Sequence, residues 1–226
     1  MPHILARTAF AALVTVLASS ASFAASTTEV KVTGTVKPPA CLPSFSGGGG
    51  VSYGVIPAAS LTKGAYTVLE KKSVAFTIQC DAPVKIAFKT TDNRASSRVS
   101  GITNGTTASP SDAYNYGLGT VSGKNVGGYT LSIDETTQVD GVATKNIFSG
   151  DNGSTWAGGV GDIQHDGHYF SFGPTMVPVG GSIKPTALKT LSATINVKPV
   201  LNKPENLPLS ADVPIDGSAT VEVIYL

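Results

Sequence analysis

The chain has 226 residues, a formal net charge of +1 and only 14% charged residues. This length suits a single β domain, and the near-zero charge gives no sign of a surface for nucleic acid or for an anionic membrane. Hydrophobic residues make up 41% of the chain, alongside 25 Gly and 14 Pro. These proportions are typical of short strands joined by many turns, and they argue against a helical protein.

The first segment, residues 1–24, is predicted to be a secretory signal peptide. One basic residue, Arg7, precedes an apolar run, Thr8–Ala18, and small residues then stand at Ser22 and Ala24, where a signal peptidase would read them. The run is too short to span a membrane with these flanks. We therefore expect an exported chain.

An alternating segment, Thr27–Val36, follows the predicted cleavage site. Apolar or small side chains share one face and polar ones share the other, which predicts an amphipathic strand. The apolar face carries Val30, Val32, Gly34 and Val36. Pro38 and Pro39 should end the strand, because proline cannot donate to a ladder.

The chain has two cysteines, Cys41 and Cys80. An even count in an exported chain predicts a disulfide. Closing a loop of about forty residues should stabilise the fold by about 4 kcal/mol. Two free buried thiols are the alternative interpretation. The glycine run that follows Cys41, Gly47–Gly50, is typical of a flexible loop.

Alternating runs continue along the chain. Ser73–Cys80 is a predicted strand with Val74, Phe76, Ile78 and Cys80 inward, followed by a turn at residues 81–83. The next strand has Val84, Ile86 and Phe88 inward, and it either pairs with its predecessor or crosses to a second sheet. Further strands are expected at Tyr114–Leu118, Gly128–Ile133, His168–Phe172 and Leu191–Val197, the last ended by Pro199.

Two stretches, Thr90–Ser111 and Asp134–Ser154, are polar and are predicted to be exposed loops with turns such as Asp140-Gly141. The chain ends on another alternating run, Gly217–Leu226, whose inward positions are Ala219, Val221, Val223 and Tyr225. A terminal strand of this kind offers its free edge to another chain. About eight or nine strands without a convincing amphipathic helix predict an all-β sandwich.

One cluster resembles a metal site. Asp162, His165, Asp166 and His168 have residue types that bind zinc, but their spacing is not that of a closed zinc site. A polar turn that leads into a strand explains the cluster equally well. The sequence shows neither a Ser-His-Asp arrangement nor a nucleophile elbow, so we expect no enzyme activity and no cofactor.

Three stretches resemble subunits of chaperone–usher fimbriae: G-T-V-K-P-P-A-C (Gly34–Cys41), T-I-Q-C-D-A-P (Thr77–Pro83) and the terminal strand with its penultimate Tyr225. The chain is also similar to a fimbrial-type family of exported Gram-negative proteins. That similarity rests on Y-G-L-G-T (residues 116–120), G-G-Y-T-L (residues 127–131) and D-N-G-S-T-W (residues 151–156).

This resemblance implies an incomplete immunoglobulin-like sandwich, residues 38–226, which is completed by a donated strand. A periplasmic chaperone would lend the strand first, and the N-terminal extension of another fimbrial subunit would replace it at an outer-membrane usher. The disulfide Cys41–Cys80 would join the first two strands. The donor, residues 25–37, would use Val30, Val32, Gly34 and Val36; the chaperone-facing edge would use Gly217, Ala219, Val221, Val223 and Tyr225.

The function expected from this resemblance is that of a structural subunit in a cell-surface fibre, reached by way of the periplasm. A tip adhesin for a host receptor or glycan is one alternative, with loops 90–111 and 134–167 as its surface. A self-complete periplasmic β-sandwich is another. The short interval before Cys41 leaves open whether the N-terminal strand pairs within its own chain or with another, and the subunit's position in the fibre stays open too.

Overall fold

The computed structural model of the chain describes residues 26–107, 110–159, 161–165, 167–174 and 181–226. The predicted signal peptide and Asp166 lie outside the described residues. Contacts divide the chain into two units, Met1–Lys37 and Pro38–Leu226. In the described part of the first unit, residues 26–37, no strand is formed, and Val30, Val32 and Val36 are 86–98% exposed. The strand predicted at Thr27–Val36 is therefore absent from the isolated chain.

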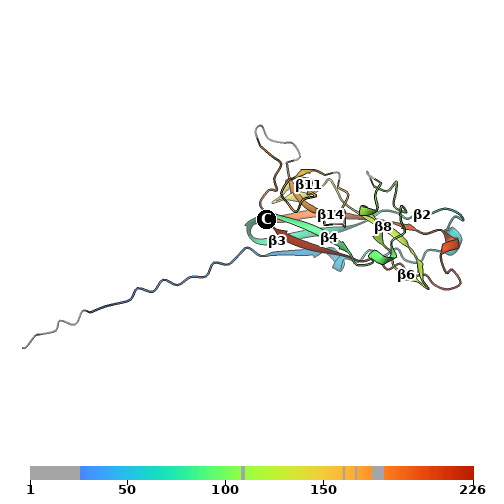
Figure 1. Cartoon of the computed structure of the whole chain (residues 1–226), viewed down its shortest axis with the longest axis horizontal. Helices are drawn as coiled ribbons and strands as arrows, with labels where there is room; N and C mark the ends of the chain where they lie inside the picture. Colours follow the sequence, from blue (N-terminus) through green and yellow to red (C-terminus); the bar gives the residue numbers. More distant parts are fainter. Residues whose placement is uncertain (1–25, 108–109, 160, 166, 175–180) are drawn as a thin grey trace, which may run out of the picture. The chain divides into compact units, whose positions relative to one another are not determined.

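The second unit is all-β, as predicted, with strands that pair antiparallel in two main sheets (Figure 1). The described residues contain short 3-10 turns and no α-helix, and no helix long and apolar enough to cross a membrane is present among them. The first sheet has the order β1 (Cys41–Phe45), β3 (Lys72–Val84), β14 (Leu188–Leu201), β8 (Gly127–Ile133) and β5 (Tyr116–Gly117), with β2 (Thr67–Val68), β9 (Gln138–Val139) and β10 (Val142–Ala143) attached.

The second sheet has the order β12 (Ala157–Gly158), β11 (Lys145–Ser149), β13 (Tyr169–Gly173), β4 (Ile86–Asp92) and β15 (Ala219–Tyr225). A two-stranded ribbon, β6 (Thr120–Val121) with β7 (Lys124–Asn125), continues the β5–β8 pair, to which the hydrogen bond from Val126 N–H to the carbonyl of Gly119 joins it. The 3-10 turns are η1 (Ser46–Gly49), η2 (Ala58–Ser60), η3 (Ala95–Ser97), η4 (Asp112–Tyr114) and η5 (Pro204–Asn206).

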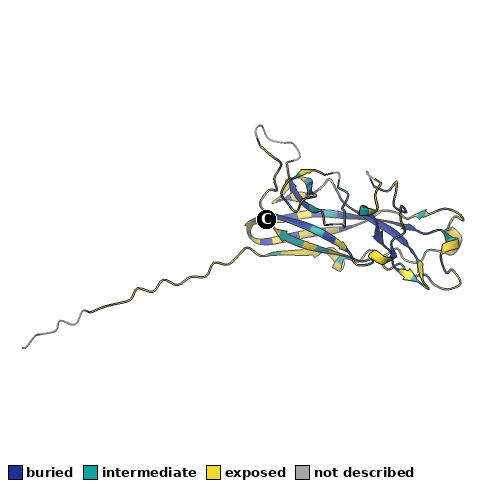
Figure 2. Cartoon of the chain, in the orientation of Figure 1, coloured by how far each residue is buried: buried dark blue, intermediate teal, exposed yellow. Residues whose placement is uncertain are grey.

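The core lies between the two sheets, where inward side chains from both meet. In Figure 2, buried stretches (dark blue) follow the long strands of the second unit. In β3 the alternation that the sequence predicts is realised, since Val74, Phe76, Ile78 and Cys80 are at most 9% exposed. The ring of Phe76 lies 5.8 Å from that of Phe88 in β4, so aromatic contacts join the sheets. Such edge-to-face pairs add to the free energy gained by burial alone.

The turn predicted at residues 81–83 is wrong. β3 continues to Val84, and only Lys85 separates it from β4, which belongs to the other sheet. The chain thus takes the second of the two expected routes and crosses between sheets. Asp81 stays in the extended chain because its N–H donates to the carbonyl of Ala40 at 3.0 Å, which prolongs the pairing of β1 with β3.

The end predicted for the long strand at Pro199 is also wrong, because β14 continues to Leu201. The carbonyl of Pro199 accepts the N–H of Leu69 at 2.9 Å. The N and C=O of one strand residue point to the same adjacent strand. The nitrogen of Pro199, which has no hydrogen to donate, therefore points to the interruption between β2 and β3. Proline is tolerated in a sheet at such irregular positions.

The polar stretch Asp134–Ser154 is more than a loop, which corrects the sequence interpretation. It contains the β9–β10 hairpin, with Asp140-Gly141 at its turn, and the strand β11. Within β11, Ile147 and Ser149 are buried, and the strand pairs with β13 through residues 145–149. Tertiary pairing fixes this strand, because one buried apolar side chain gives too little pattern to predict it.

Candidate functional site

The last strand, β15, lies at an edge of the second sheet and pairs with β4 from Ala219 opposite Asp92 to Tyr225 opposite Ile86. Ala219, Val221 and Val223 are partly buried against the core, while Thr220 and Glu222 face solvent. The face predicted from the alternation is therefore the inward face at these three positions, whereas Tyr225, also predicted to point inward, is 50% exposed. An edge strand presents a row of backbone N–H and C=O groups that can pair with a further strand.

β1 lies at an edge of the first sheet, and an apolar groove opens between it and β15. This cavity, here called the strand groove, has a volume of about 410 Å³. One wall is the end of β1 and the segment that follows it, from Phe45 to Tyr53, and the other wall is Ile215–Val221. Core side chains from both sheets form its floor, namely Val74, Phe76, Phe88, Tyr129, Leu131 and Ile195. The floor of the groove thus belongs to the hydrophobic core, and its side chains are at most 9% exposed.

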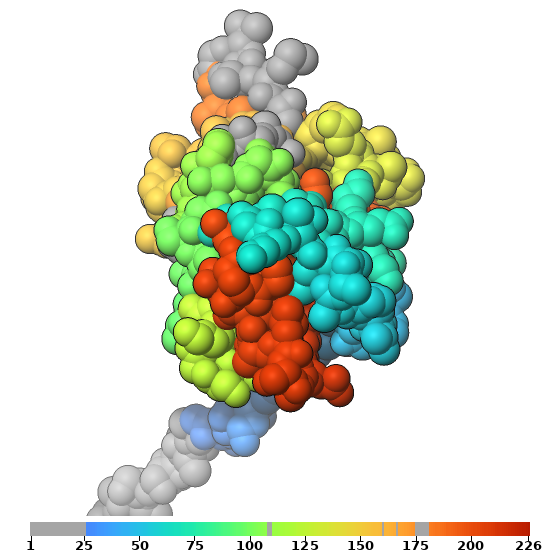
Figure 3. All heavy atoms as spheres, turned by 90° about the vertical axis from the view of Figure 1, so that its right-hand side faces the viewer, coloured from blue at the N-terminus to red at the C-terminus, as the bar shows by residue number. Residues whose placement is uncertain are grey.

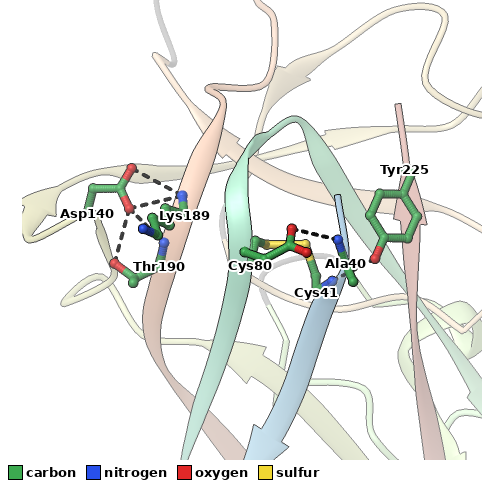
Figure 4. Close-up of a disulfide and its surroundings, with 8 residues drawn as sticks. Ala40, Cys41, Cys80, Asp140, Lys189, Thr190 and Tyr225 are labelled. Atoms are coloured by element: carbon green, nitrogen blue, oxygen red, sulfur yellow. Dashed lines mark hydrogen bonds between the residues drawn. A yellow bond between two sulfur atoms is a disulfide. The ribbon is translucent and has the colours of Figure 1, made fainter. Parts of the chain in front are cut away.

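The strand groove is closed at the far end of β15. The N–H of Cys41 donates to the hydroxyl of Tyr225 at 2.7 Å, which joins the start of β1 to the end of β15 (Figure 4). Val223 and Tyr225 do not line the groove, whereas Val221 and Ala219 do. The groove therefore extends from Val221 toward Gly217. The backbone at Gly217 lies close against the floor, since a Cβ atom there would be only 2.8 Å from the ring of Tyr129.

The predicted disulfide is confirmed. The sulfurs of Cys41 and Cys80 are 2.06 Å apart, and the two residues are directly paired between β1 and β3. The N–H of Ala40 donates to the carboxylate of Asp81 at 2.9 Å, one residue beyond the disulfide (Figure 4). The disulfide and this hydrogen bond therefore fix the N-terminal end of the second unit, residues 40 and 41, to β3.

A second hollow, here called the end hollow, continues the strand groove past the start of β15. Its volume is about 930 Å³, and its walls are residues 51–58 and residues 209–215. Val51, Tyr53 and Ile215 line both cavities, so the two are contiguous. In Figure 3, segments beyond residue 200 (red) lie beside segments around residues 60–70 (cyan) at this end of the molecule. Apolar side chains of the end hollow include Val55, Ile56, Leu61, Leu207 and Leu209.

The groove carries little charge. Its two phenols have pKa values above the ordinary range because burial disfavours the phenolate, for Tyr129 and more weakly for Tyr53. Tyr53 donates its hydroxyl to the carbonyl of Val197 at 3.0 Å, and Tyr129 packs on Tyr116 with ring centres 5.2 Å apart. These rings hold the floor and wall in place, and the cavity suits an apolar strand better than a charged ligand.

The other residues predicted to be functional lie at several places in the structure. Val30, Val32, Gly34 and Val36 lie in the exposed N-terminal segment. Among the described residues, no group of acidic, His or Cys side chains could hold a metal ion, so Asp162, His165 and His168 form no such site. The loops 90–111 and 134–167, considered as a receptor surface, contribute Thr90 and Ile163 to the strand groove.

Sequence reasoning missed the first wall of the groove. The glycine run predicts only a flexible loop here, yet residues 48–51 and Tyr53 line the cavity beside Phe45. Gly47, Gly48 and Gly49 have φ values of 59°, 70° and 81°, a region that favours glycine, and they turn the chain away from β1. The alternation of Val51, Tyr53 and Val55 after the turn was the available signal.

The fold and the groove define an all-β sandwich with an open apolar groove between two edge strands. A family model described as "Protein of unknown function (DUF1120)" matches residues 30–143, and the chain belongs to this family. The match spans the N-terminal segment, the disulfide and the first wall of the groove.

The chain is also similar to "Uncharacterized protein YhcF" of Escherichia coli (strain K12). The two are 25% identical over 220 residues, which cover 88% of this chain and 89% of the relative. No solved structure matches the chain.

Proposed function

We propose that the chain is a structural subunit of a fimbria-like surface fibre, in which the N-terminal segment of one copy completes the immunoglobulin-like sandwich of another. A periplasmic chaperone and an outer-membrane usher would handle the subunit during its export. One observation carries the proposal: the same chain holds an apolar groove beside a free strand edge and an unpaired segment with valines at alternate positions. The two features are complementary in chemistry and in period.

The exposed valines favour binding of the segment to an apolar surface. Val30, Val32 and Val36 are 86%, 92% and 98% exposed. Burial of each would stabilise a complex by roughly 1.5–3 kcal/mol. The groove offers apolar side chains for the valines to pack against. The edge of β15 offers backbone N–H and C=O groups for hydrogen bonds with the segment.

Gly34 supports a partner outside the isolated chain. A Cβ atom at this position would meet nothing within 4 Å, so no contact among the described residues calls for glycine there. Glycine weakens a strand interior and commonly marks a close approach of two backbones. An acceptor groove of another copy supplies such an approach.

The proposal is tested by assembly of the exported chain, purified with its chaperone and analysed by size-exclusion chromatography and electron microscopy. Replacing Val30, Val32 and Val36 with Asp should leave the subunit unable to donate and therefore unable to form polymers. Replacing Lys31, Thr33 and Thr35 with Asp changes the opposite face and is the matched control. Assembly by the control but not by the valine variant is expected; equal assembly by both variants contradicts the proposal.

A further inference from the structure

The end hollow lies next to the strand groove, and a strand bound in the groove would end beside it. We propose that this hollow is the seat of Pro38 and Pro39 of the donating copy. The inference rests on the proposed function and extends it, because it places a contact between the bodies of two copies outside the donated strand itself.

The direction of the bound strand follows from the closed end of the groove. A donor segment is tethered at its C-terminal end to its own body, which begins at the Ala40–Asp81 hydrogen bond. That body cannot pass the contact between Tyr225 and Cys41, so it must stay at the open end, beside Gly217. The donor therefore runs antiparallel to β15, which is also the more stable pairing.

The register of the donor strand against β15 is determined by which side chains must face the groove. Directly opposite residues of an antiparallel pair share a face, and a slip of one residue would turn the valines to solvent. In the register that places Val32 opposite Val221, Val36 lies opposite Gly217 and Pro38 lies opposite Ile215. The proline pair then arrives at the boundary of the two cavities, which Ile215 lines.

The chemistry of the end hollow suits a proline pair. Two consecutive prolines favour the extended polyproline conformation and carry no N–H, so they bind by apolar contact. Proline-rich segments in this conformation dock in grooves lined by aromatic and apolar side chains. Here Tyr53 stands at the boundary, and Val55 and Ile56 lie on the wall beyond it. Val55 is 95% exposed in the isolated chain and gains a partner in the complex.

The test measures binding of two synthetic peptides to the full-length monomer by native mass spectrometry and fluorescence anisotropy. One peptide has the sequence of residues 26–36, and the other that of residues 26–40. We expect the longer peptide to bind about tenfold more tightly, because it adds the apolar contacts of the two prolines. A third peptide, residues 26–40 with Pro38→Ser and Pro39→Ser, should bind like the short one.

A variant of the acceptor separates this contact from the groove. Val55→Asp places a charge on the wall of the end hollow at a side chain that makes little contact in the monomer. It should remove the advantage of the longer peptide and leave binding of the short peptide unchanged. Val142→Asp, at a 70% exposed position of β10, is the matched control and should change neither.

The outcomes are distinct. If neither peptide binds, the proposed function fails and the proline contact fails with it. If the short peptide binds and the longer one binds no better, or if its advantage survives Val55→Asp, the end hollow has another occupant while strand donation stands. The serine peptide tests the prolines without any change to the acceptor. If it binds as tightly as the unchanged peptide of residues 26–40, the proposed role of the prolines is overturned.

Discussion

Asp92, at the end of β4, is held by the protein interior, since its side chain is fully buried. Its carboxylate accepts hydrogen bonds from the guanidinium of Arg98 at 2.6 Å and from the N–H of Gly117 at 3.0 Å. The N–H of Arg94 donates to its second oxygen at 2.9 Å. The residue thus fixes the loop after β4 against β5, close to the start of β15.

Replacing Asp92 with Ala should destabilise the fold by about 3 kcal/mol or more, because the charge of Arg98 and two backbone N–H groups lose their partner. The free energy of unfolding, measured by urea titration, checks this value. Glu135→Ala is the control, since Glu135 pairs with Lys145 at 3.4 Å where both side chains are exposed. Exposed pairs contribute roughly 0–1 kcal/mol, so a control loss as large as that of Asp92→Ala would contradict the argument.

The disulfide gives a second prediction at this scale. Cys41 and Cys80 are 39 residues apart in sequence, and closing a loop of that size should stabilise the fold by about 4 kcal/mol. The double replacement with Ala should lower the urea midpoint accordingly, and it should also loosen the start of β1. A midpoint equal to that of the parent chain would show that the bond contributes nothing to stability.

The β9–β10 hairpin is attached to β14 through the side chain of Asp140 at its turn. The carboxylate accepts the N–H of Thr190 at 2.6 Å and that of Lys189 at 3.0 Å (Figure 4). These backbone donors, that of Thr190 first, hold the pKa of Asp140 below its ordinary range. Asp140 has a φ of 51°, which Asn adopts as readily as Asp does, so Asp140→Asn removes the charge without backbone strain.

A carboxyl with a lowered folded-state pKa stabilises the fold above its unfolded pKa of about 3.9. This contribution is lost as the pH falls through the folded-state pKa. The difference in free energy of unfolding between the parent chain and Asp140→Asn should therefore be largest near neutral pH and should shrink at acidic pH. A difference that stays constant across this range would mean that the charge of Asp140 is irrelevant to the attachment of the hairpin.

Elements differ in how well the sequence predicts them. β8, β15 and the part of β3 up to Cys80 alternate clearly in sequence, so the period of two predicts their positions. Strands of two residues, such as β9 and β12, carry no period, and only their partners in the sheet define them. The route of β14 past Pro199 depends on an irregular neighbour, which sequence reasoning cannot see.

For the whole molecule, the alternation of the sequence predicted the inward face of β15, whereas the strand predicted at Thr27–Val36 is absent from the isolated chain. The sequence did not predict the strand groove between β1 and β15. That cavity depends on which edges of the two sheets lie together and on the backbone turn at Gly47–Gly49. Long-range pairing decides both, and local patterns carry little information about it.

If each subunit both donates and accepts a strand, the length of a fibre should depend on the fraction of copies that can do both. A copy with Val30, Val32 and Val36 replaced by Asp keeps its groove but loses its donor face, so it can join one neighbour only. Mixed with the parent chain, it should shorten fibres roughly in inverse proportion to its fraction, as electron micrographs can measure. The Lys31, Thr33 and Thr35 variant should enter fibres without shortening them. Fibres of unchanged length that contain the valine variant would show that growth does not use this face.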